Sequence, residues 1–205
     1  MKRNLLLLVV LLIGTEGFAQ KFSLGVLAGI SQNYEFTKRV NPHTSFTPPY
    51  SKNTVDNALN PTFGIFGAYT INKKHKVELE VRYRKIVQQQ TGDFRRLYLN
   101  TTITPYYAYT ITPRWSAAIG VYYNLLLATG ISQGENPGPT TPSPYIYPGF
   151  ASNNTYGGTL KVAYRLKRVS IEGGFMAPIT SYSKNDYIAY YIPTSFIQLK
   201  YDFLK

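Results

Sequence analysis

In the stretch KVELEVRYRK, residues 76–85, ionised and apolar side chains alternate from Lys76 to Arg84. Successive side chains of a β-strand point to opposite faces, so one face of the expected strand would be apolar and the other ionised. The apolar face would carry Val77, Leu79, Val81 and Tyr83, and the ionised face Glu78, Glu80, Arg82 and Arg84. The fold of the chain depends on which of these faces meets water.

A similar alternation of polarity recurs along the chain beyond its first residues, without a convincing long helical period. It predicts eight strands, each ended by turn or loop residues. The expected strands are residues 22–31, 61–71, 76–87, 96–110, 115–127, 155–166, 169–179 and 193–204.

Short and long connections alternate strictly between these strands. NKKH, ITPR and KR are tight turns, whereas residues 32–60, 88–95, 128–154 and 180–192 form the longer connections. All tight turns would therefore lie at one end of the sheet. This asymmetry is typical of a transmembrane β-barrel with short periplasmic turns and long extracellular loops.

The narrow interior of a small barrel decides which face points outward. An eight-stranded barrel has room inside only for its own side chains or one small ligand, and bulky apolar groups from every strand would overfill it. We therefore predict an all-β, eight-stranded antiparallel up-and-down transmembrane β-barrel, rather than a soluble lipocalin-like barrel with an apolar interior. The residues expected to face lipid include Val77, Leu79, Val81, Ile119, Val121, Leu160, Val162, Leu199 and Phe203.

The N-terminal residues MKRNLLLLVVLLIGTEGFAQ have the pattern of a secretory signal peptide. A basic start precedes the apolar residues 5–13, and Gly17-Phe18-Ala19 forms a small-x-small cleavage box. The apolar run is too short to cross about 30 Å of hydrocarbon at about 1.5 Å per residue. We expect residues 1–19 to be cleaved and residues 20–205 to form one outer-membrane barrel domain.

The composition excludes several classes of function. The 205 residues include no cysteine, which excludes disulfide frameworks, thiol catalysis and cysteine-based zinc sites. With two histidines in the chain, a transition-metal site is not expected either, and no cofactor is predicted. The net charge is +12, but export makes nucleic acid an unexpected partner.

Charged residues at inward positions form the largest candidate site. Opposite charges in a narrow, poorly hydrated interior must pair, because an isolated buried ion costs several kcal/mol. The pattern predicts an ion-pair network that plugs the lumen, with a narrow ion path or a proton-sensitive gate as the alternative. Its members would be Glu78, Glu80, Arg82, Arg84, Lys161, Arg165, Glu172, Lys200 and Asp202.

Two stretches resemble a known class of proteins. Ala19-Gln20-Lys21-Phe22 leads into FSLGVLAGI, and the chain ends with FIQLKYDFLK. Both resemble the small outer-membrane β-barrel domains of the PorT-like and OmpA-like type, whose last strand usually ends on an aromatic residue; here Phe203 is followed by Leu204 and Lys205. The resemblance implies insertion into the cell outer membrane by the barrel-assembly machinery and no single activity.

The first long connection contains a possible catalytic pair. His43 and Ser45 stand two positions apart, with Glu35 and Asp56 in the same connection. A Ser–His–acid hydrolase would need these groups within hydrogen-bond reach. One His-x-Ser does not define such a site, so a lipid-modifying hydrolase is the least favoured alternative and no catalytic residue is predicted.

Binding is expected at the two ends of the barrel. Loops 32–60 and 128–154 are the places where other envelope proteins would bind. The short-turn end would meet anionic lipid headgroups or an acidic partner through Lys73, Lys74, Lys76, Arg114, Lys167, Arg168 and Lys205. We therefore predict a non-enzymatic envelope anchor or a subunit of an outer-membrane assembly, with a narrow solute or ion channel as the alternative.

Overall fold

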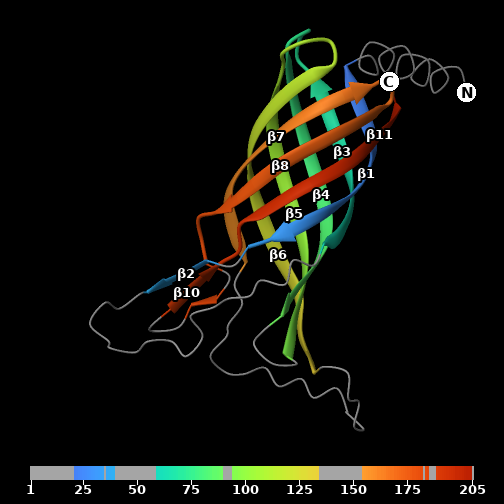
Figure 1. The fold of residues 1–205 in the computed structure, drawn as a ribbon. Coiled ribbons are helices and arrows are strands. Elements are labelled where there is room, and N and C mark those ends of the chain that lie inside the picture. Colours follow the sequence, from blue (N-terminus) through green and yellow to red (C-terminus); the bar gives the residue numbers. More distant parts are fainter. Residues whose placement is uncertain are drawn as a thin grey trace, which may run out of the picture.

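Strands of alternating polarity close into an antiparallel β-barrel in this computed structural model of the protein (Figure 1). The structure describes residues 21–34, 36–39, 59–89, 94–133, 154–181, 183–184 and 188–204. The barrel strands are β1 (Phe22–Asn33), β3 (Asn60–Thr70), β4 (His75–Gln89), β5 (Phe94–Thr110), β6 (Trp115–Gln133), β7 (Thr155–Leu166), β8 (Val169–Pro178) and β11 (Thr194–Leu204). Among these described residues, no helix is both long and apolar enough to cross a membrane.

The topology is up-and-down, and the eight predicted strands are confirmed. Each strand pairs with its neighbours along the barrel, and β1 pairs with β11 to close it. The largest difference in strand length is in β6, which continues from the predicted end at residue 127 to Gln133. The run Leu125–Leu127 hides the alternation there, while pairing with β5 as far as Phe94 keeps the strand extended.

A second, small sheet lies on the side of the long connections (Figure 1). It contains β2 (Phe36–Arg39), β9 (Ser183–Lys184) and β10 (Ile188–Tyr191), in the order β2-β10-β9. These strands lie in connections 32–60 and 180–192, where the sequence predicted loops. Such short strands depend on partners far away in the sequence, so local alternation could not reveal them.

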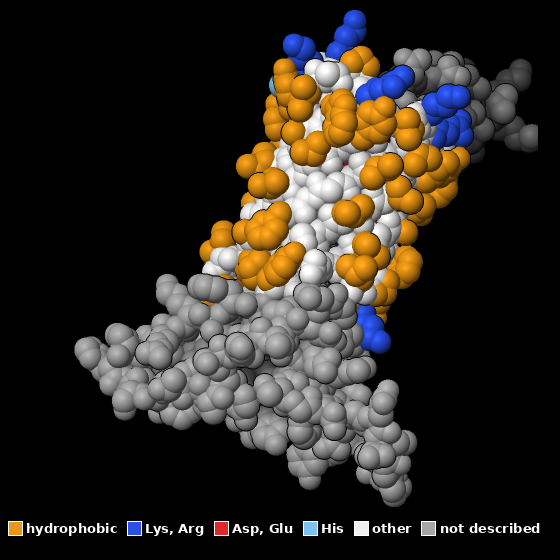
Figure 2. All heavy atoms as spheres, viewed as in Figure 1, with side chains coloured by type: hydrophobic (Ala, Val, Ile, Leu, Met, Phe, Trp, Pro, Cys, Tyr) orange, Lys and Arg blue, Asp and Glu red, His pale blue; other side chains and the backbone are white. Residues whose placement is uncertain are grey.

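The two faces of the barrel wall differ sharply in polarity. On the outer face the side chain of Ile119 is 68% exposed, whereas on the inner face Glu80 is 0% and Arg82 is 1% exposed. The residues predicted to face lipid all lie at outward positions, where all are exposed except the half-buried Val81. Figure 2 shows apolar side chains over the visible wall and cations at the short-turn end. This arrangement is the inverse of a water-soluble barrel.

Close approach between strands requires glycine at Gly64. This residue points inward from β3 and pairs with Arg82 of β4. A Cβ atom added there would lie 2.2 Å from the backbone oxygen of Val81, which cannot move without disturbing the pairing of β4. The tight approach of β3 and β4 therefore depends on the missing side chain.

Replacing Gly64 by alanine should lower the free energy of unfolding by about 1–3 kcal/mol, the usual cost of overpacking. The matched control is Gly158→Ala on β7, where an added Cβ meets no atom within 4 Å. Urea unfolding of both variants in the same lipid vesicles measures the difference. Equal stability of the two variants would contradict the close approach of β3 and β4.

Candidate functional site

Four strands bring charged side chains to one level of the lumen. The alternation of each strand turns these side chains inward: Glu78 and Glu80 from β4, Lys161 from β7, Glu172 from β8 and Lys200 from β11. In the closed barrel β4 and β8 lie diametrically opposite, four strands apart in either direction. Contacts among these side chains therefore cross the whole lumen.

Each of the two lysines bridges three carboxylates. Lys161 Nζ lies 2.5 Å from Glu78 Oε1, 2.5 Å from Glu80 Oε1 and 2.9 Å from Glu172 Oε2. Lys200 Nζ lies 2.5 Å from Glu80 Oε1 and 3.3 Å from Glu172 Oε2, and it also pairs with Glu78. The two ammonium groups thus tie β4 to the opposite side of the barrel.

Arg82 completes a neutral group that we name the ion cluster. Its Nε atom lies 3.4 Å from Glu80 Oε2. The three positive charges of Arg82, Lys161 and Lys200 then balance the three carboxylates of Glu78, Glu80 and Glu172. All six residues are buried. Burying ions is favourable overall only when the charges are paired and well hydrogen-bonded. The lysine contacts meet this condition, whereas Arg82 Nε and Glu80 Oε2 form an ion pair without a hydrogen bond among the described residues, so this contact is the looser part of the cluster.

Neutral side chains complete the surroundings of the ion cluster. Gln198 Nε2 donates to Glu80 Oε1 at 3.2 Å and to Glu172 Oε2 at 2.8 Å. Each cation of the cluster also lies over an aromatic ring, which favours a desolvated cation. The distances to the ring centroids are 4.1 Å for Lys161 over Tyr106, 4.4 Å for Lys200 over Phe66 and 4.6 Å for Arg82 over Phe196.

The remaining predicted network residues lie outside the ion cluster. Arg84 donates to Asn124 Oδ1 at 3.2 Å and to Met176 Sδ at 3.7 Å. Arg165 pairs with Asp202 at 3.2 Å, and its side chain is 38% exposed. The structure therefore divides the predicted network into three parts. They are the central ion cluster, the hydrogen bonds of Arg84 and the more exposed ion pair of Arg165 with Asp202.

Sequence reasoning missed the neutral members of the site. It expected an inward face rich in small residues, whereas Phe66, Tyr106 and Phe196 are inward and buried. Because successive side chains of a strand alternate between the two faces, the sequence did indicate that these three residues point inward. Their contacts with cations on other strands depend on the closure of the barrel and have no local sequence pattern.

The ion cluster has little free space and no vacant position for a metal. Oxygen atoms of Glu78, Glu80 and Glu172 lie within 4.8 Å of one another, but the lysine ammonium groups occupy the space between them. A cavity beside the cluster, on the short-turn side, has a volume of about 10 Å³. This is room for about one water molecule.

Several predicted features lie outside the described residues. They are the signal peptide at residues 1–19, the pair His43 and Ser45, Lys205, most of loop 32–60 and most of loop 128–154.

Neutralising Glu80 with Glu80→Gln should lower the free energy of unfolding by about 3–5 kcal/mol, because it leaves a buried excess of positive charge. Adding Lys200→Met restores neutrality, so the double variant should lose less stability than the sum of the single variants. The control is Lys76→Gln. Lys76 pairs with Glu78 at 2.8 Å but its side chain is 23% exposed, so its loss should cost about 1 kcal/mol or less.

Urea unfolding of the wild-type protein, the two single variants, the double variant and the Lys76→Gln control in lipid vesicles measures these differences. If the double variant loses as much unfolding free energy as the two single variants together, direct coupling between Glu80 and Lys200 is contradicted.

Comparisons with known proteins identify the fold. No protein-family model matches the chain, and no curated protein matches it in sequence. Neisserial surface protein A is similar in structure, with a TM-score of 0.50, 11% sequence identity and coverage of 89% of this chain and 97% of that chain.

Two further solved structures are similar at lower scores. Ail, the attachment invasion locus protein of Yersinia pestis, has a TM-score of 0.47 and 10% identity, covering 89% of this chain and 99% of that chain. The outer membrane protein AlkL has a TM-score of 0.45 and 11% identity, covering 88% of this chain and 90% of that chain. The chain thus has the fold of the eight-stranded outer-membrane β-barrels.

Proposed function

We propose that the protein is a non-enzymatic outer-membrane barrel that anchors its long connections at the cell surface and keeps its lumen closed. The observation that carries this proposal is the ion cluster, which links β4 to the opposite strand β8 through two shared lysines. A lumen crossed by mutually paired charges is a plug rather than a path for ions. The small barrel leaves little room for water around it.

The polarity of the wall supports membrane insertion. A continuous apolar outer surface is unfavourable in water and is covered in lipid. The proposal includes removal of residues 1–19 during export and insertion by the barrel-assembly machinery. Outer-membrane lipids are then the first partners of the barrel. The finer relation to the PorT-like and OmpA-like type belongs to this proposal and rests on the terminal strands alone.

The small sheet supports a role for the long-connection end in binding. Phe36–Arg39 of the first long connection pairs with Ile188–Tyr191 of the last one. Pairing between two connections gives this end a structured base beyond the barrel wall. We infer that loops 32–60 and 128–154 present the binding surfaces to other envelope proteins, either as an anchor or as part of a larger assembly.

In planar lipid bilayers the wild-type protein should show no steady ion conductance, because the ion cluster blocks the lumen. The variant Glu80→Ala/Lys200→Ala removes one charge of each sign and two bulky side chains, so it should conduct. The control Arg165→Ala/Asp202→Ala makes the same balanced change outside the cluster and should stay closed. Steady conductance of the wild-type protein would favour the narrow channel instead.

Ile119→Arg should lower the free energy of unfolding in lipid vesicles by about 2–4 kcal/mol, the range for arginine on the lipid face near the bilayer midplane. The control Ile111→Arg makes the same change in a tight turn, where the side chain is 59% exposed and the cost should fall to about 0–1 kcal/mol. Both variants are measured by urea unfolding in the same vesicles. An equal and small effect at both positions would mean that the outer wall does not meet lipid.

A further inference from the structure

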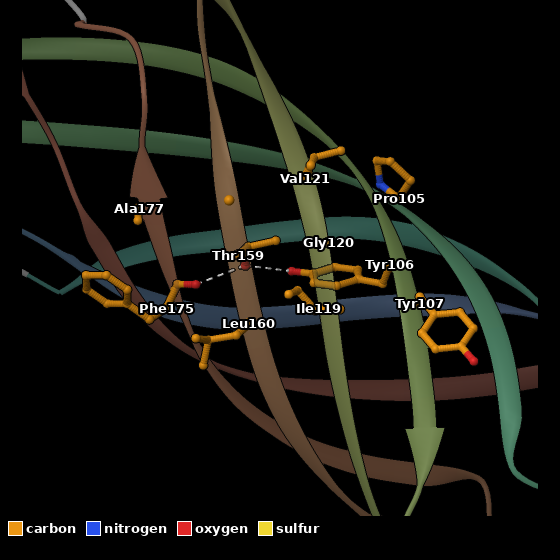
Figure 3. A pocket seen from close by; sticks show the side chains of 11 residues that line it. Pro105, Tyr106, Tyr107, Ile119, Gly120, Val121, Thr159, Leu160, Phe175 and Ala177 are labelled. Carbon is orange, nitrogen blue, oxygen red and sulfur yellow. Dashed lines mark hydrogen bonds between the residues drawn. The ribbon is translucent and has the colours of Figure 1, made fainter.

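A groove crosses the outer wall of the barrel over β5, β6, β7 and β8 (Figure 3). Its volume is about 760 Å³. The register of the strands explains it. A floor row of smaller residues runs from strand to strand beside a rim row of bulkier ones. The floor row is Pro105, Val121, Gly158 and Ala177, and the rim row is Tyr107, Ile119, Leu160 and Phe175.

On the other side of the floor row, the next outward-facing row of residues is also bulky. Ile103 pairs with Tyr123, which pairs with Tyr156, and the backbone of Ile179 bonds to that of Tyr156. The floor row therefore lies between two raised rows. At its centre, Gly158 leaves open space, because an added Cβ would meet no atom within 4 Å.

The groove offers almost no polar group to a ligand. The hydroxyl groups of the lining are bonded within the protein. Thr159 Oγ1 donates to the backbone oxygen of Phe175 at 3.0 Å and is hydrogen-bonded to Tyr106 OH at 3.3 Å (Figure 3), and Tyr107 OH is hydrogen-bonded to His75 Nδ1. Pro105 lacks an N–H group altogether. The lining therefore fits a hydrocarbon chain.

The two hairpins that carry the groove both end in cationic turns. The β5–β6 turn contains Arg114, and the β7–β8 turn is Lys167-Arg168. Neither turn contains an acidic residue. Lys167 has a φ of 55°, a left-handed conformation that costs a residue other than glycine about 1 kcal/mol. Lys167 is thus a cation at a position where the left-handed backbone conformation favours glycine or asparagine.

Aromatic side chains lie directly beside these cations. Arg114 Nη1 donates to Tyr164 OH at 3.2 Å, and the rings of Trp115 and Tyr164 are 4.8 Å apart. Trp and Tyr next to Arg and Lys mark the headgroup level of a membrane. The cationic turns therefore lie where the phosphate groups of lipids would be.

The distance from these cations to the groove matches a lipid chain. Arg114 and Val121 are seven positions apart along β6. This separation is about 23 Å along the strand, or about 17 Å along the membrane normal at the usual tilt. Half of a hydrocarbon core is about 15 Å thick. The groove therefore lies at the depth that the end of a lipid chain reaches when its headgroup is at the level of the cationic turns.

We propose that the groove holds one acyl chain of an anionic phospholipid whose phosphate group lies against Arg114 and the Lys167-Arg168 turn. This inference rests on the membrane insertion proposed above. The charge of the turns selects an anionic headgroup, and the apolar floor takes the chain.

The groove is too small to be an interface with a second copy of the barrel. Its floor spans four strands in one direction and one row of side chains in the other, which is only about 14 Å by 7 Å. A stable dimer needs about 800 Å² from each partner, so the groove is too small for a second barrel.

The test uses the full chain reconstituted in vesicles of equal phosphatidylglycerol and phosphatidylcholine, then extracted for native mass spectrometry. The wild-type barrel should retain one lipid, with phosphatidylglycerol favoured about fivefold, as expected for about 1 kcal/mol from a surface cation. Gly158→Leu fills the groove and should lose the retained lipid. Replacing all three cations of the two turns (Arg114→Gln, Lys167→Gln and Arg168→Gln together) should keep a lipid but remove most of the preference for phosphatidylglycerol.

The matched control is Gly67→Leu on the outer face of β3. There an added Cβ meets only the side chains of Phe22 at 3.5 Å and Leu24 at 4.0 Å. It should retain the lipid as the wild-type protein does. Equal retention by Gly158→Leu and Gly67→Leu would overturn the inference, and so would a Gly158-dependent dimer. Flotation of every variant with the vesicles tests membrane insertion separately, so loss of the lipid site is distinguishable from failure to insert.

Discussion

The neutral balance of the ion cluster is the constraint on which the barrel depends. Three carboxylates inside a narrow lumen need three cations at contact distance, and these come from strands on opposite sides of the wall. A slip of one residue in any of these strands would turn its charge outward into the apolar face. The cluster therefore acts on register as well as on the volume of the lumen, because a one-residue slip would leave its partners unpaired.

The alternation of polarity was sufficient to predict the eight barrel strands and the two faces of the wall. In β4 the nine successive side chains from Lys76 to Arg84 fall on the sides that a narrow barrel requires, and Lys85 is an ionised residue at an outward position. The tight turns gave the order of the strands, since sequential neighbours then pair. This part of the fold is local information, because each strand contains its own period and each turn its own composition.

The contacts within the lumen could not be predicted in the same way. The sequence placed Lys161 and Glu80 on the inner face, but their contact depends on barrel closure, which brings residues 81 positions apart within 2.5 Å. The three inward aromatic rings were missed because a narrow lumen suggested small residues. In the structure these rings lie beneath the cations and fill the space that small residues on neighbouring strands leave.

The small sheet has a consequence for how the barrel closes. Its strands β2 and β10 directly continue the seam between β1 and β11, and Tyr34 N donates to Pro193 O at 2.8 Å between the two sheets. Joining the first and last strands carries the largest loop-closure entropy of any strand pair in this topology. Once the seam forms, β2 and β10 are already neighbours and pair at little further entropic cost. We therefore expect the small sheet to form once β1 and β11 have paired to close the barrel.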